Sequence, residues 1–131
     1  MTPTPRVTGI GGVFFKTRDR ARLGDWYRRH LGIDVQDGGF AIFRWRDDED
    51  PSRPGTTVWS LFPDSTEYFG AGEQRAMINY RVADLDAVLA ALRREGVTVD
   101  ERVAETAEGR FGWITDPDGN RIELWQPPPG Q

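Results

Sequence analysis

The chain has 131 residues, a length that suits one domain with a modest hydrophobic core and leaves no room for a second domain. Its 17 Lys and Arg residues are spread among 21 Asp and Glu residues, for a net charge of −4, so the basic stripe typical of nucleic-acid binding is absent. Because the sequence has no cysteine, no run of about 18 apolar residues and no apolar secretory signal near its start, we expect a cytoplasmic protein without disulfides, thiol chemistry or a membrane span.

The first predicted element is a strand. Residues 10–17 have the β-branched and aromatic content of a strand. Gly11 and Gly12 either weaken this strand or mark a close backbone approach, because a glycine inside a strand has no side chain to pack.

An amphipathic helix is predicted next, over residues 20–31. Asp19 is placed to cap its start, and Gly32 follows as a natural stop. Trp26 and Tyr27 fall on the helix face that we expect to pack on the sheet. The basic residues of this helix alternate with acidic ones, so we interpret them as a solvated surface.

Two strand-like runs follow, at residues 40–45 and 56–62. The loop between them, residues 46–55, is charged and contains two prolines, so the pair is consistent with an antiparallel hairpin. Residues 63–74 form a connector, and the first half ends near Gly72.

The second half begins with the clearest alternation in the chain. Over residues 77–82, Met77, Asn79 and Arg81 fall on one face of the predicted strand, and apolar side chains fall on the other. Residues 84–96 then have the cap, the apolar spacing and the glycine stop of a second helix.

The strongest hairpin signal is the turn sequence Asp-Pro-Asp-Gly at residues 116–119. A hairpin closed at this turn places Trp113 opposite Glu123 and Phe111 opposite Trp125. The apolar neighbours of Glu123 on the same strand are expected to face the helix, so Glu123 points to the other side.

The two halves repeat one order of elements: strand, capped helix, glycine stop, short strand and hairpin. We interpret them as a degenerate internal duplication, with a first module at about 10–72, a second at about 76–126 and a flexible tail at 127–131. Such a repeat packs both helices on one side of the strands. The opposite, concave side is left to face a ligand.

Three motifs resemble the vicinal oxygen chelate superfamily, which includes glyoxalase I, bleomycin-resistance proteins and extradiol dioxygenases. They are Trp-Tyr-Arg-Arg-His-Leu-Gly at 26–32, Arg-Val-Ala-Asp-Leu-Asp at 81–86 and Asp-Pro-Asp-Gly-Asn-Arg-Ile-Glu-Leu at 116–124. The resemblance implies the α+β fold of this superfamily, in which two βαβββ modules form a cupped mixed sheet with the helices on its outer face.

The resemblance also implies where a metal would bind. Carried over by position, the superfamily's ligands fall at Gly12, at Met77, near Trp59 or Ser60, and at Glu123, and only Glu123 keeps a ligating side chain. A divalent ion needs three or four converging oxygen or imidazole ligands. We therefore expect no metal and no other cofactor. The one histidine, His30, lies at the end of the first predicted helix, where it is more often present to interact with the helix dipole than to act in catalysis.

The candidate site is an aromatic cup. Glu123 is the candidate catalytic residue, either a general base or a ligand anchor, or else a structural ion-pair partner. The candidate ligand-binding residues are Phe14, Trp59, Met77, Asn79, Arg81, Phe111, Trp113 and Trp125. Trp59 is equally consistent with a core position, since the register of its hairpin is not fixed by the sequence.

The leading hypothesis is a protein of this superfamily that binds a small organic molecule, as bleomycin-resistance proteins do, without the family's metal. One alternative is a lyase, isomerase or dioxygenase that holds a divalent metal through non-standard ligands. Another is a homodimeric interaction module whose aromatic face is buried between subunits and binds no ligand. In each case we expect a homodimer and no nucleic-acid or membrane partner.

Overall fold

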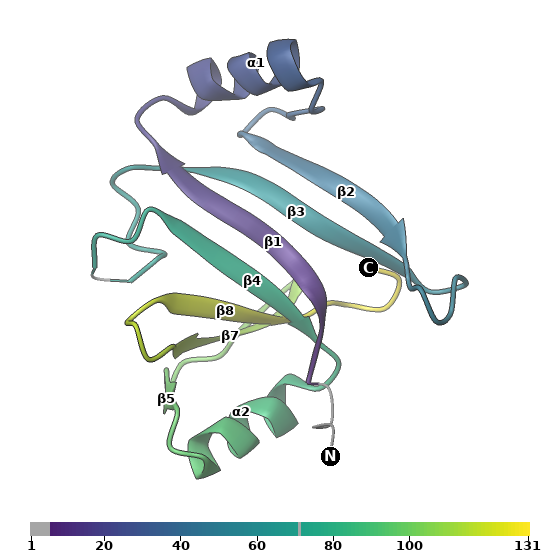
Figure 1. Cartoon of the computed structure of the whole chain (residues 1–131), viewed down its shortest axis with the longest axis vertical. Helices are drawn as coiled ribbons and strands as arrows, with labels where there is room; N and C mark the ends of the chain where they lie inside the picture. The colour runs from purple at the N-terminus through teal and green to yellow at the C-terminus, as the bar shows by residue number, and fades with distance from the viewer. Residues whose placement is uncertain (1–5, 71) are drawn as a thin grey trace. The chain divides into compact units, whose positions relative to one another are not determined.

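The computed structural model describes residues 6–70 and 72–131, within which the chain forms eight strands and two helices (Figure 1). These elements divide into two compact units. The first unit is Gly12–Met77, and the second unit is Ile78–Gln131 together with the residues up to Gly11. The fold is α+β, and neither helix in the described ranges has the length and apolar character needed to cross a bilayer.

A strand, a helix and a hairpin make up the first unit. Its elements are β1 (Val7–Thr17, of which the part from Gly12 belongs to this unit), α1 (Arg20–Leu31), β2 (Phe40–Arg46) and β3 (Pro54–Pro63). The central strand, β3, is parallel to β1 and antiparallel to β2, so the predicted hairpin is confirmed. Asp19 accepts a hydrogen bond from the main-chain N–H of Arg22 at 3.0 Å, and Gly32 ends the helix at a φ of 67°.

Side chains of β1 and β3 alternate between the two faces of the first unit's sheet. Phe15 and Trp59 lie on the face that α1 covers, because the ring of Tyr27 on α1 is 6.1 Å from Phe15 and 4.9 Å from Trp59. Phe14 points to the opposite face, where its ring is 5.4 Å from that of Phe62. The expectation that Trp59 lies with Phe14 on the open face is therefore wrong.

Helix α1 approaches its sheet closely at Gly24, its buried residue. A Cβ at Gly24 would lie 3.2 Å from the side chain of Val35, between α1 and β2, and 3.9 Å from that of Leu61 on β3. Tyr27 takes the sheet-facing position next along the helix. Trp26, which we also expected to pack on the sheet, is 49% exposed and lies against His30, with ring centroids 5.0 Å apart.

The second unit contains the rest of the strands and the second helix. Its elements are β4 (Ala76–Val82, from Ile78 in this unit), α2 (Leu85–Arg94), β5 (Thr98–Val99), β6 (Ala104–Thr106), β7 (Gly109–Thr115) and β8 (Arg121–Gln126). The strand order is β4-β8-β7-β5, and β6 also pairs with β7. Strands β4 and β8 are parallel, and the β7–β8 hairpin is antiparallel.

The core of the second unit lies between its sheet and α2. It consists of Val82, Leu85, Val88, Leu89 and Leu124, with Tyr80, Ile114 and Ile122 among the partly buried residues packed around them. The β7–β8 register pairs Trp113 with Glu123 and Phe111 with Trp125, which confirms the predicted hairpin. Since Ile122 and Leu124 face α2, the side chain of Glu123 between them lies on the opposite face of the sheet.

Candidate functional site

Glu123 on β8 is a buried carboxylate, with only 1% of its surface exposed. Asn79 on β4 donates through Nδ2 to its Oε1 at 2.6 Å, and Trp113 on β7 donates through Nε1 to its Oε2 at 2.9 Å. Both donors lie directly across from Glu123 in the strand register. Hydrogen bonds to a carboxylate are stronger than neutral ones, so the register of three adjacent strands fixes this acid in place.

Two arginines lie over the indole ring of Trp113. The guanidinium carbon of Arg102 is 4.9 Å from the ring centroid, and that of Arg121 is 5.3 Å from it. Arg121 also donates to Asp100 at 3.3 Å. The main-chain N–H of Arg102, and to a smaller extent the Arg121 guanidinium, hold the pKa of Asp100 below its ordinary value. Positive charge thus surrounds the ring that donates to Glu123.

A second aromatic pair lies on the same face, two residues along the strands from Trp113 and Glu123. The rings of Phe111 and Trp125 are stacked, with centroids 6.1 Å apart and planes 6° from parallel. Trp125 donates through Nε1 to the main-chain oxygen of Glu108 at 2.8 Å. Arg81 on β4 lies over Trp125, with 5.2 Å between the guanidinium carbon and the ring centroid.

Gly11 on β1 leaves room for these side chains. A Cβ at Gly11 would lie 2.1 Å from Oδ1 of Asn79, 2.9 Å from the ring of Trp125 and 3.0 Å from Cγ of Arg81. No side chain larger than hydrogen fits there without moving at least two of them. Of the two alternatives for Gly11, a weakened strand or a close approach to the backbone, the structure shows the close approach.

The remaining predicted residues lie in the first unit. Phe14 is buried on the face away from α1, and Lys16 on the same face holds its ammonium 5.4 Å from the ring centroid of Phe69. Met77 is buried on β4, two residues before Asn79. Trp59 contacts Tyr27 of α1, as described above, and is not among the residues on the face of Phe14.

The side chains at the superfamily's ligand positions do not fit its divalent metal. Gly12 has no donor, and a Cβ there would lie 2.6 Å from the ring of Phe14. Met77 offers a thioether, a poor ligand for the metals concerned. Within residues 6–70 and 72–131, no group of three or more His, Asp or Glu side chains is arranged to hold an ion.

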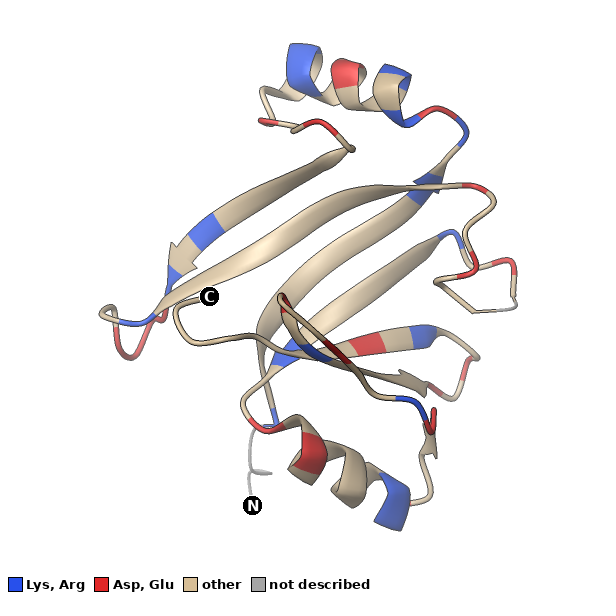
Figure 2. Ribbon diagram, turned by 180° about the vertical axis from the view of Figure 1, so that it is seen from behind, with Lys and Arg blue, Asp and Glu red and all other residues tan. Residues whose placement is uncertain are grey.

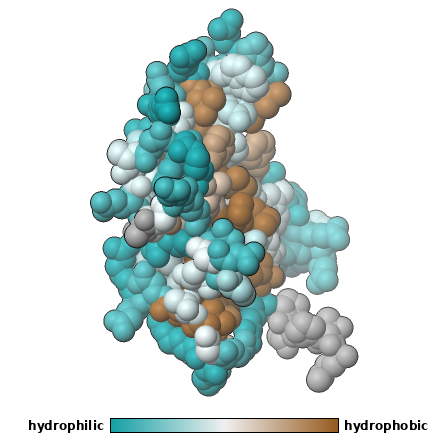
Figure 3. Space-filling model, turned by 60° about the vertical axis from the view of Figure 1, so that its left-hand side comes forward, coloured by the Kyte–Doolittle hydropathy of each residue, from teal (hydrophilic) through white to brown (hydrophobic). Residues whose placement is uncertain are grey.

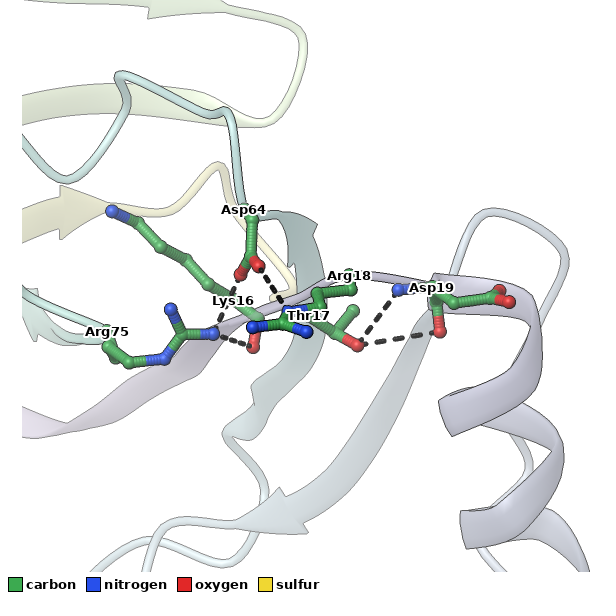
Figure 4. Close-up of polar contacts among 6 residues, drawn as sticks. All are labelled: Lys16, Thr17, Arg18, Asp19, Asp64 and Arg75. Atoms are coloured by element: carbon green, nitrogen blue, oxygen red, sulfur yellow. Dashed lines mark hydrogen bonds and ion pairs between the residues drawn. The ribbon is translucent and has the colours of Figure 1, made fainter.

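The first unit also has an open groove of about 710 Å³ beside α1, which the sequence did not predict. Trp26 and Tyr27 line it with several Arg and Asp side chains, and Figure 2 shows basic and acidic residues alternating along α1. Asp64 pairs with Arg75 at 2.7 Å and with Arg18 at 3.8 Å, beside this groove (Figure 4). Because its charges pair with one another, the groove offers a weaker binding signal than the buried cluster around Glu123.

Two units of strand, capped helix and hairpin, with a carboxylate anchored on the last strand, define a glyoxalase-type α+β domain. The chain belongs to the family described as the glyoxalase-like domain, which matches residues 12–125, within the glyoxalase, bleomycin-resistance and dioxygenase superfamily. The resemblance seen in the sequence is thereby confirmed.

Solved structures of similar proteins have the same fold. Methylmalonyl-CoA epimerase from Mycobacterium tuberculosis is 24% identical, with a TM-score of 0.68 over 98% of this chain and 94% of that one. A Streptomyces coelicolor methylmalonyl-CoA epimerase in complex with 2-nitronate-propionyl-CoA is 21% identical, with a TM-score of 0.67 over 92% and 98%. A superfamily member from Vibrio splendidus 12B01 is 13% identical, with a TM-score of 0.56 over 89% and 97%. No curated protein matches the sequence.

Proposed function

We propose that this chain binds a small organic molecule on the face of the second unit's sheet that carries Glu123, Trp113 and Trp125, without a metal ion. The observation that supports this most directly is the buried carboxylate of Glu123, held by two hydrogen bonds of 2.6 and 2.9 Å. Trp113 and Trp125 are themselves buried, and aromatic side chains with a few oriented polar groups are the usual lining of a small-molecule site.

The donor chemistry favours binding over metal-dependent turnover. Both carboxylate oxygens of Glu123 already accept hydrogen bonds, and Gly12 and Met77 supply no hard ligand. Sequestration of a ligand requires burial and complementary polar groups but no activated water or Lewis acid. Acyl-CoA thioesters belong among the first ligands to try, because the Streptomyces coelicolor epimerase is found in complex with one.

A thermal-shift screen of metabolites and drugs tests this proposal. A ligand at about 100 times its Kd adds about 2.7 kcal/mol of stability, which raises Tm by several degrees. Trp113→Phe removes a donor to Glu123 and is expected to weaken any shift. Glu49→Gln, in the exposed loop between β2 and β3, serves as the control and is expected to leave the shift unchanged.

Two results would overturn the proposal. One is a wild-type protein whose Tm responds to no compound in the screen at millimolar concentration. The other is a stoichiometric divalent metal in the purified protein, detected by mass spectrometry and lost in Glu123→Gln, since this would assign Glu123 to a metal site.

We also propose that the chain forms a homodimer. Strand β2 lies at the edge of the first unit's sheet, and its residues Ile42 and Phe43 are 44% and 48% exposed. Hydrophobic side chains reach the surface among hydrophilic ones in Figure 3. An edge strand with exposed apolar residues is a common site of pairing with a second chain.

A further inference from the structure

Arg81 is a buried cation on the same face as Glu123. The residue is only 8% exposed, and burial lowers the pKa of its guanidinium from the ordinary value. The ring of Trp125, 5.2 Å away, stabilises the charge where water is excluded. A guanidinium carries five N–H donors in a planar fork whose shape matches a carboxylate, so Arg81 is chemically suited to bind one.

Residues 127–131 fold back onto Arg81. The main-chain N–H of Gln131 donates to the main-chain oxygen of Pro128 at 3.3 Å, which closes a turn. Through Nη2, Arg81 donates a hydrogen bond to the main-chain oxygen of Gln131. Residues 129–131 are exposed, so little buried surface holds this segment in place. Arg81 therefore has an oxygen partner that can be displaced.

A second polar group lies two residues away along the strands. Arg81 pairs with Trp125 and Asn79 pairs with Glu123 in the parallel register of β4 and β8. Two residues along a strand span about 6.6 Å. Within the described part of the chain, Oδ1 of the buried Asn79 has no hydrogen-bond partner and packs against Gly11, so a ligand hydroxyl that reaches it would satisfy a buried acceptor.

We propose that Arg81 binds a carboxylate of the ligand and that residues 127–131 cover Arg81 until the ligand displaces them. This rests on the proposed function and narrows it to one ligand class: a small aromatic carboxylate with a hydroxyl at its far end. The carboxylate meets Arg81, the ring lies beside Trp125 and Phe111, and the hydroxyl reaches Asn79.

Calorimetric titration with three matched probes tests the inference. 4-Hydroxybenzoate carries both groups, 4-hydroxybenzamide replaces the carboxylate with a neutral amide, and benzoate lacks the hydroxyl. Wild type is expected to bind 4-hydroxybenzoate about 10- to 100-fold more tightly than 4-hydroxybenzamide, because a charge-assisted pair is lost. Benzoate is expected to bind more weakly than 4-hydroxybenzoate.

Three variants separate the roles of the parts. Arg81→Gln is expected to remove the preference for the carboxylate, and Arg81→Lys to restore only part of it, since an ammonium cannot form the paired hydrogen bonds. Deletion of residues 127–131 is expected to tighten binding of 4-hydroxybenzoate by about 10-fold, because the competing oxygen is gone. Arg94→Gln, at the exposed end of α2, is the control and should match wild type.

The outcomes distinguish this inference from the proposed function. Equal affinity for the acid and the amide, or no binding of either probe, overturns the inference. The proposed function stands in that case if the compound screen still finds ligands whose shift Trp113→Phe weakens. The proposed function fails as well if the compound screen finds no ligand. Unchanged affinity after deletion of residues 127–131 overturns the covering role of that segment.

Discussion

The hydrogen bond from Asn79 to Glu123 joins two fully buried side chains, so removing one partner leaves the other without compensation. Asn79→Ala is expected to lower the free energy of unfolding by about 1–3 kcal/mol, because Oε1 of Glu123 loses its donor in a water-poor site. Urea unfolding at neutral pH measures the loss. In the Glu123→Gln background the same substitution should have a smaller effect, since no charge is stranded. Equal losses in both backgrounds would contradict this account.

Gly11 has a comparably specific role at the residue scale. Gly11→Ala places a methyl carbon 2.1 Å from Oδ1 of Asn79, well inside contact distance, and is expected to destabilise the protein by about 1–3 kcal/mol. Gly72→Ala is the matched control, because the nearest atom to its Cβ would be 4.0 Å away. Comparison of the two Tm values checks the prediction, and a loss no larger for Gly11→Ala than for Gly72→Ala would contradict it.

The β7–β8 turn gives a pH-dependent prediction at the scale of an element. Asp116 accepts from the side chain of Asn120 at 2.9 Å and from the main-chain N–H groups of Asn120 and Asp118 at 2.9 and 3.0 Å. The hydrogen bond from the Asn120 side chain, followed by those from the main chain, holds the pKa of Asp116 below its ordinary value. A carboxyl whose pKa is lower in the folded state stabilises that state above its unfolded pKa, about 3.9.

This stabilisation is therefore present at neutral pH and is lost as the pH falls through the folded pKa of Asp116. Asp116→Asn keeps an acceptor oxygen but cannot ionise. The difference in Tm between wild type and Asp116→Asn is expected to be largest near neutral pH and to shrink toward about pH 2. Thermal melts across this range measure it. A difference that grows on acidification would contradict the assignment.

Local signals made most elements predictable. Helix α1 begins after Asp19 and ends at Gly32, as predicted, and the turn at 116–119 sets the pairing of Trp113 with Glu123. Caps and tight turns were predictable because they are determined by a few neighbouring residues. The face on which Trp59 lies was not predictable, since it depends on how β3 packs against α1 far along the chain. The exposure of Trp26 was not predictable either, because helical spacing does not say which of two adjacent aromatic residues contacts the sheet.

In the candidate site too, features set by local sequence were predictable and features set by long-range contacts were not. Alternation along β4 and β8 indicated that Asn79, Arg81 and Glu123 share a face. The donor Asn79 became visible only once the parallel register of β4 with β8 was known, because no local pattern sets the register of strands joined by a long crossover. The contact of Gln131 with Arg81 joins residues far apart in the sequence and left no signal in it.

At the scale of the whole molecule, the proposed homodimer is tested through the edge strand β2. A charge on an exposed edge disfavours pairing with another chain, so Phe43→Lys is expected to shift the protein toward monomer. Trp26→Lys is the control, since Trp26 is an equally exposed aromatic on α1 rather than on an edge strand. Sedimentation velocity at high micromolar concentration distinguishes the two states. A monomeric wild type would contradict the proposal, and equal dissociation by both substitutions would place the interface elsewhere than β2.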